Sequence, residues 1–201
     1  MHERFPRVAK TANATPEVAA FFDAATSTLT YVVTSPESNQ CTIIDPVLDY
    51  DEASASVGTA SADNVVRYVQ ENSLSVDYIL ETHVHADHLS GAHYLRRLLG
   101  GLVGIGAEIT GVQSTIAEIY SDSSPLARNG SQFDVLFEDE HRLAFGSLDI
   151  RVLHVPGHTP GCVAYLIGDA LFAGDTLFMP DSGTARCDFP GGDARHLYRS
   201  I

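Results

Sequence analysis

The sequence predicts a mixed α/β fold, and three features of the chain support this prediction. Residues 76–80 form a short apolar run rich in β-branched and aromatic side chains, which is typical of a buried strand. Residues 60–72 place Val65 and Val69 on one face of a helix. From residue 135 onward, short apolar stretches alternate with turns, which indicates antiparallel strands.

The remaining elements follow from the same periodicities, with glycine and proline marking the turns between them. Gly100-Gly101 closes one helix, and Gly168-Asp169 joins the two strands of a hairpin. No repeat, low-complexity tract or linker interrupts the chain, so we expect residues 1–201 to form a single domain. Strands are predicted at residues 29–34, 41–45, 76–80, 103–106, 135–137, 142–145, 148–154, 163–167 and 170–173, and helices at residues 60–72, 89–99, 112–120 and 194–199.

Length, charge and cysteine content argue against several functional classes. The chain has 201 residues, of which 44% are hydrophobic, and a formal net charge of −14. Because no Lys/Arg cluster breaks this acidic balance, we expect neither nucleic acid nor a membrane as a partner. No segment is long enough to span a membrane, and residues 1–10 lack the apolar core of a secretory signal. The three cysteines (Cys41, Cys162 and Cys187) are odd in number and lack CxxC spacing, which favours a reducing, cytoplasmic location over a disulfide framework.

A segment directly after the predicted strand 76–80 concentrates metal-binding side chains, namely His83, His85, Asp87 and His88. His83 and His85 alternate, so in an extended strand end they point to the same side. Three imidazoles are costly to bury together unless a metal satisfies them. We therefore interpret the segment as a metal site and not as a solvated His-rich loop, because such motifs are expected between a strand and a helix.

Three further positions bear on this site. His158 lies in a Pro/Gly-rich loop after one predicted strand, and Asp175 follows the next predicted hairpin. Taken alone, each is more often an ordinary loop residue, but together with the His-rich segment they give three strand ends that each deliver a metal-binding side chain. Asp45 ends another predicted strand, where it either lies near the metal edge of the sheet or starts a turn.

The order and spacing of these residues resemble those of the metallo-β-lactamase superfamily: a His-x-His-x-Asp-His segment at residues 83–88, then His158, then Asp175. The resemblance covers about residues 29–201. It implies an αββα sandwich with the metal site at one sheet edge. Those members that act on glutathione compounds continue further, with another histidine near the metal and much of the glutathione pocket, so the resemblance implies either that this chain is truncated at its C-terminal end or that the remaining sheet comes from elsewhere.

Four segments, at residues 81–91, 156–162, 174–178 and 184–189, are similar to persulfide dioxygenases, and above all to their bacterial branch known as β-lactamase-like hydrolases. That resemblance implies oxidation of glutathione persulfide by O₂ to sulfite and glutathione on one Fe²⁺ per chain. The implied iron ligands, which are also the implied catalytic residues, are His83, His158 and Asp175. His85, Asp87 and His88 would hold these ligands in orientation through hydrogen bonds.

Glyoxalase II, a dinuclear thioesterase, is the nearest relative of that family and gives a second reading of the same residues. In this reading His83, His85 and His158 bind one metal ion, such as Zn²⁺, Asp87 and His88 bind the other, and Asp175 bridges them. A third reading is an inactive metal-binding fragment.

The segment 184–189 favours the dioxygenase reading. Its Arg186 and Asp188 match that family, which implies that they brace the loop beside the metal and take part in substrate binding; the alternative is a surface salt bridge. Cys187 replaces the usual threonine, and we expect an inert packed thiol there. His93 and His196 are interpreted as ordinary helix-surface residues. The expected partners are therefore glutathione persulfide and O₂, and a homodimer is compatible with this reading.

Overall fold

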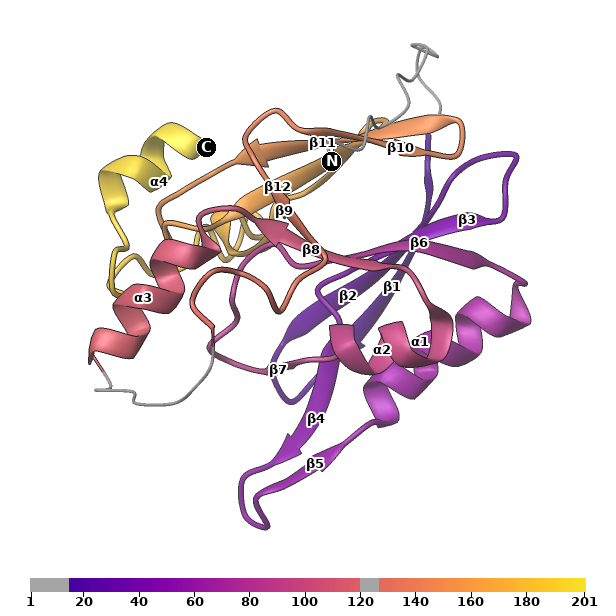
Figure 1. Ribbon diagram of the computed structural model, residues 1–201, viewed down its shortest axis with the longest axis horizontal. Coiled ribbons are helices and arrows are strands. Elements are labelled where there is room, and N and C mark those ends of the chain that lie inside the picture. The colour runs from indigo at the N-terminus through magenta and orange to yellow at the C-terminus, as the bar shows by residue number, and fades with distance from the viewer. Residues whose placement is uncertain (1–14, 120–126) are drawn as a thin grey trace.

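A six-stranded sheet forms the first layer of the molecule (Figure 1), which is described here for residues 15–119 and 127–201 of a computed structural model. The strand order is β1-β2-β3-β6-β8-β9. The first three strands pair antiparallel, whereas β3, β6, β8 and β9 pair parallel. The strands are β1 (Glu17–Asp23), β2 (Thr28–Thr34), β3 (Gln40–Ile44), β6 (Ser75–Leu80), β8 (Leu102–Gly106) and β9 (Val135–Phe137).

A four-stranded antiparallel sheet forms the second layer, in the order β10-β11-β12-β13. Its strands are β10 (Arg142–Phe145), β11 (Leu148–His154), β12 (Val163–Ile167) and β13 (Ala170–Phe172). A small three-stranded sheet lies beside the first layer and consists of β5 (Ser56–Gly58), β4 (Val47–Asp51) and β7 (Leu89–Ser90).

The main hydrophobic core lies between the two large sheets. Leu80 and Phe137 from the first sheet pack with Phe145 and Tyr165 from the second, and all four are almost fully buried. Burial of each such side chain contributes about 1.5–3 kcal/mol. The Tyr165 hydroxyl donates a hydrogen bond to the Glu81 carbonyl oxygen at 2.8 Å, which ties the core to the segment that carries the histidines.

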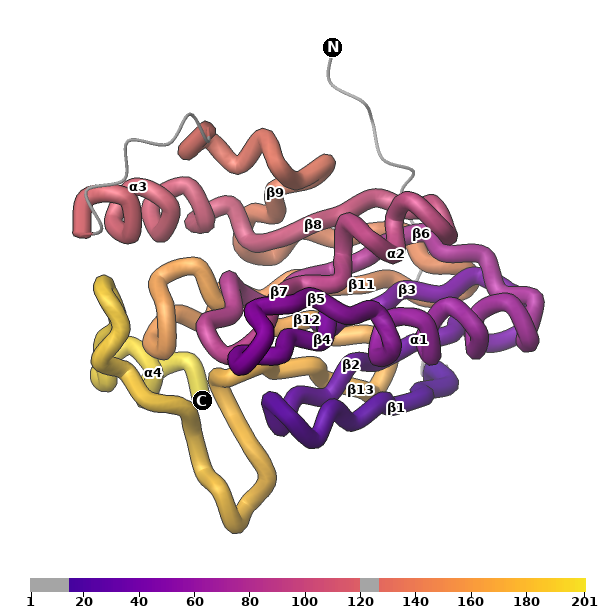
Figure 2. Tube along the Cα trace, turned by 90° about the horizontal axis from the view of Figure 1, so that it is seen from below, coloured from indigo at the N-terminus to yellow at the C-terminus, as the bar shows by residue number. Residues whose placement is uncertain are grey.

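The helices lie outside these layers. The helices α1 (Ala60–Glu71) and α2 (Ala92–Leu99) cover the outer face of the first sheet, where Val65 and Leu95 join a core with Ile79. The helix α3 (Ile109–Ile119) follows β8, and α4 (Ala194–Ser200) follows a loop that projects from the body of the molecule in Figure 2. None of the helices within the described ranges is both long and apolar enough to cross a bilayer.

The structure confirms the predicted mixed α/β fold and corrects several element boundaries. The helix expected from residue 89 begins at Ala92, because Leu89–Ser90 pairs with β4 and the Ser90 hydroxyl accepts a hydrogen bond from the Ala92 amide at 3.0 Å. The helix expected from residue 112 begins at Ile109, and residue 120, like residues 1–10, falls outside the described residues. The strands β1, β4 and β5 were not predicted.

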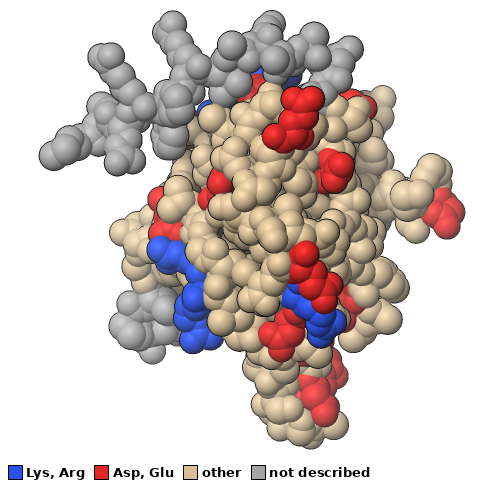
Figure 3. All heavy atoms as spheres, turned by 90° about the vertical axis from the view of Figure 1, so that its right-hand side faces the viewer, with Lys and Arg blue, Asp and Glu red and all other residues tan. Residues whose placement is uncertain are grey.

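The molecular surface reflects the acidic composition. On the face shown in Figure 3, acidic side chains are spread widely and the basic side chains lie next to them. Several arginines pair with carboxylates, as Arg96 does with Asp134 at 2.7 Å and Arg151 with Glu140 at 2.6 Å. The expectation that nucleic acid is not a partner stays a prediction.

Candidate metal centre

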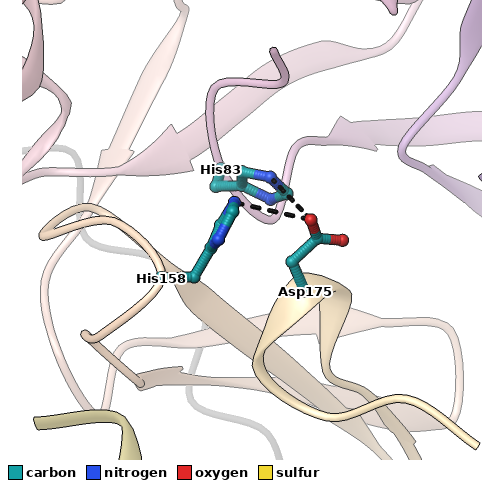
Figure 4. A group of neighbouring side chains, drawn as sticks. All are labelled: His83, His158 and Asp175. Carbon is teal, nitrogen blue, oxygen red and sulfur yellow. Dashed lines mark ion pairs between the residues drawn. The ribbon is translucent and has the colours of Figure 1, made fainter. Parts of the chain in front are cut away.

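The structure brings His83, His158 and Asp175 together at one end of the sandwich (Figure 4). His83 follows β6, His158 follows β11, and Asp175 lies in η1 (Gly174–Thr176), a short 3₁₀ turn after β13. The Asp175 Oδ2 atom lies 3.8 Å from His83 Nε2 and 3.4 Å from His158 Nε2. One ligand atom from each residue lies within 4.8 Å of the other two, so a single ion can reach all three.

Hydrogen bonds fix which nitrogen each imidazole presents to Asp175. The Thr82 hydroxyl donates to an Asp45 carboxylate oxygen at 2.8 Å, so it accepts from His83 Nδ1, which lies 3.0 Å away. His158 Nδ1 donates to the Arg186 carbonyl oxygen at 2.7 Å. In the neutral form of each ring, Nε2 therefore carries the lone pair and faces the carboxylate. Two neutral imidazoles and a carboxylate form a donor set that fits a divalent transition metal.

His85 is engaged by two buried carboxylates. Its Nε2 atom lies 3.2 Å from Asp45 Oδ1 and 3.1 Å from Glu81 Oε2. Glu81 also accepts a short hydrogen bond from the Ser90 hydroxyl, and Asp45 accepts one from the Thr82 amide at 2.7 Å. Because Nε2 has to donate to these acceptors, only Nδ1 of His85 remains as a ligand atom.

Asp87 and His88 form a second group together with His85, whose ligand atoms also lie within 4.8 Å of one another. The Thr28 hydroxyl donates to Asp87 at 3.2 Å and lies 3.3 Å from His88 Nδ1. Within the described part of the chain, His88 Nε2 is buried and has no hydrogen-bond partner. A buried polar atom without a partner is costly, so this nitrogen marks a position that a ligand or water would satisfy.

The electrostatics of the centre differ from one side chain to the next. Burial, reinforced by the neighbouring His85, lowers the pKa of His83 to about 3, so this imidazole stays neutral at physiological pH. Burial raises the pKa of Asp175, although the nearby histidines oppose this shift. Burial also opposes protonation of His85, but the carboxylates of Asp45 and Glu81 outweigh it and hold the pKa of His85 well above its usual value.

We expect the metal-free chain to lose stability as the pH falls below 6.5. Between pH 6.5 and about 3, His83 takes up a proton in the unfolded chain but not in the folded one, so stability decreases toward lower pH. At ~1.4 kcal/mol per pH unit, the loss between pH 6.5 and 5 is about 2 kcal/mol. The raised pKa of His85 does not change the pH dependence of stability between pH 6.5 and 5. Below the pKa of histidine in the unfolded chain, His85 is protonated in both states, so its contribution to stability is constant. Urea unfolding of the metal-free protein at both pH values measures this loss. A His83→Asn variant should show a smaller pH dependence, and equal slopes in the two proteins would contradict the assignment.

The roles predicted for the other positions stay predictions. Arg186 pairs with Asp188 through two hydrogen bonds of 2.5 and 2.8 Å, and both side chains are exposed. Cys187 is partly buried, and all three cysteines are free thiols. His93 and His196 lie on the surfaces of α2 and α4.

Three residues with evident roles were not singled out from the sequence. Glu81 and Thr82 hold His85 and His83, and Phe189 lies against His158 with ring centroids 5.1 Å apart. A glutamate at the end of a buried strand, four residues before a histidine, is itself a detectable signal, because such a carboxylate needs a partner. The sequence offers no comparable signal for Phe189.

Comparisons with known proteins agree with this architecture. The chain is 50% identical over 194 residues to a probable metallo-hydrolase of Burkholderia pseudomallei, covering 92% of this chain and 66% of the relative. It is 34% identical over 182 residues to the mitochondrial persulfide dioxygenase ETHE1 of Homo sapiens, covering 90% of this chain and 59% of the relative. The chain thus spans only part of each curated relative.

The crystal structure of ETHE1 from Myxococcus xanthus superposes with a TM-score of 0.70 at 30% identity, covering 92% of this chain and 67% of that one. A family model described as the metallo-beta-lactamase superfamily matches residues 24–201. From its fold, its histidine–aspartate centre and these similarities, the chain belongs to the metallo-β-lactamase superfamily.

Proposed function

We propose that this chain is a mononuclear non-haem iron persulfide dioxygenase. In the proposed reaction, glutathione persulfide, O₂ and water give glutathione, sulfite and two protons. The observation that carries the proposal is that ligand atoms of His83, His158 and Asp175 form one group, whereas the Nε2 atom of the adjacent His85 faces two carboxylates. Two imidazoles and one carboxylate form the ligand set that non-haem iron oxygenases use. The similarity to persulfide dioxygenases supports the same reaction.

The chain's own residues would act by holding the ligand atoms in place. A bound Fe²⁺ would supply open coordination positions for the persulfide sulfur and O₂. His83 and His158 present Nε2, because Thr82 and the Arg186 carbonyl occupy their other nitrogens. Asp175 supplies the negative charge, and it is about one third exposed, so the centre is open to small molecules on its side.

A dinuclear hydrolase of thioesters is the second candidate, and one observation favours it. The unpartnered His88 Nε2 atom lies in the group with Asp87 and His85 that could hold a second ion. In that arrangement His85 would have to bind through Nδ1, since its Nε2 atom donates to Asp45 and Glu81. The probable metallo-hydrolase among the relatives is consistent with this reaction.

Metal content and oxygen uptake, measured on the same preparation, separate these candidates. We expect the protein purified without oxygen to contain one iron per chain and to consume O₂ when glutathione persulfide is added. The matched assay uses S-lactoylglutathione, which should not be cleaved. Cleavage of this thioester without oxygen uptake, together with two metal ions per chain, would falsify the dioxygenase proposal. Metal binding without turnover of either substrate would indicate the inactive metal-binding fragment.

A further inference from the structure

The segment 185–193 connects the two loops that carry the metal-facing residues of the second sheet. At its start, the Ala185 amide donates to the Asp175 carbonyl oxygen at 3.3 Å. At its end, the Asp193 amide donates to the Gly157 carbonyl oxygen at 2.9 Å. Because both ends are tied to the backbone of these loops, the segment holds a fixed position beside the metal centre.

Close packing fixes the middle of the segment against His158. The Nδ1 atom of His158 donates to the Arg186 carbonyl oxygen at 2.7 Å. The Gly192 amide donates to the Phe189 carbonyl oxygen at 2.7 Å. A Cβ atom on Gly192 would lie 2.5 Å from the Cys187 carbonyl oxygen and 3.0 Å from that of His158, so only glycine permits this approach. The backbone of the segment and the loop of His158 therefore interlock.

Phe189 connects this backbone contact to the Arg186–Asp188 pair. Its ring meets the imidazole of His158 edge-on, with centroids 5.1 Å apart and an interplanar angle of 84°. The Arg186 guanidinium lies over the same ring, 4.9 Å from its centroid, and binds the Asp188 carboxylate through Nε and Nη2. The Arg186 guanidinium, held by the Asp188 carboxylate, thus keeps the phenyl ring in contact with His158.

We propose that Phe189, held by the Arg186–Asp188 pair, is a positioning residue for His158. The Arg186 carbonyl fixes Nδ1, and the phenyl ring restricts rotation of the imidazole, so that Nε2 stays directed at Asp175. In this arrangement Asp188 accepts hydrogen bonds from Nε and Nη2 of Arg186, and Phe189 lies against one face of its guanidinium. The inference rests on the proposed metal centre, but it holds for one iron or two zinc ions alike.

Metal release and the spectrum of bound Co²⁺ test this role independently of activity. We expect Phe189→Leu and Arg186→Gln to release Zn²⁺ to a chelator about tenfold faster than the wild type, since partners that orient a metal ligand typically contribute 10–100-fold in affinity. The visible absorption of bound Co²⁺ should change as well, because it reports the ligand geometry. Phe189→Tyr, which keeps the ring, should restore both properties. The urea midpoint of the metal-free protein should change little in all three variants.

Two control variants carry the same substitutions away from the centre. Arg142→Gln removes an exposed arginine that pairs with Asp149, and Phe22→Leu removes an exposed ring of β1. Both should release Zn²⁺ at the wild-type rate. Wild-type release and an unchanged Co²⁺ spectrum in Phe189→Leu and Arg186→Gln would overturn the proposal, as would a wild-type protein that binds no metal. A wild type that binds metal but consumes no O₂ would remove the proposed reaction alone and leave this role standing.

Discussion

Replacing Asp175 by alanine should abolish metal loading. Its Oδ2 atom lies 3.4 Å from His158 Nε2 and 3.8 Å from His83 Nε2, so the substitution removes the carboxylate on which both imidazoles converge. We expect a loss in metal affinity beyond the roughly 10–100-fold that follows from removing an orienting partner. His158→Ala should have the same effect. Elemental analysis after equilibration with a limiting concentration of metal measures the loss.

His85→Ala is the informative comparison for these variants. Because the Nε2 atom of His85 donates to Asp45 and Glu81, the variant should retain much of its metal in a mononuclear centre. Equal loss in His85→Ala and Asp175→Ala would instead indicate that His85 binds through Nδ1 in a dinuclear centre. Circular dichroism of each metal-free variant establishes that the fold is intact.

Gly157→Ala should be the most destabilising single methyl addition near the centre. Gly157 has a φ of 150°, and a Cβ atom there would lie 2.4 Å from the Leu197 Cα atom. Both the backbone conformation and the contact with α4 would have to change, at a cost of about 3 kcal/mol or more. Since His158 is the next residue, metal affinity should fall with stability. Urea unfolding and metal titration measure the two effects.

Gly183→Ala provides the matched control for this substitution. Gly183 also has a positive φ, of 80°, but a Cβ atom there would meet nothing within 4 Å. The cost should therefore be that of the backbone conformation alone, about 1 kcal/mol. If the two variants lost the same stability, crowding against α4 would not be the cause.

The location of the centre could be predicted from the sequence because its signals are local. His83 and His85 follow a strand whose apolar composition identifies it as buried, and His158 and Asp175 each follow a recognisable hairpin or strand. The contacts that orient these side chains could not be predicted in the same way. The Arg186 carbonyl and the Phe189 ring reach His158 through the path of the chain, which no residue pattern encodes.

The fold shows the same division between local and distant determinants. The strand β6 and the helix α1 have clear periodicities and lie within a residue or two of their predicted bounds. The strands β1, β4 and β5 exist because of their neighbours: β1 has only exposed or partly buried residues and is defined by its pairing with β2. The predicted start of helix α2 at residue 89 was wrong for the same reason: Ser90 pairs with β4, which is distant in sequence.

The three metal-facing residues come from both layers of the sandwich, with His83 at the end of the first sheet and His158 and Asp175 at the end of the second. An ion held by all three would join the two layers at this end of the sandwich, in addition to the hydrophobic core and the hydrogen bonds that already connect them. Removing the ion with a chelator would then affect more than activity. It would weaken the contact between the two sheets at one end of the molecule and make the chain there more susceptible to proteases.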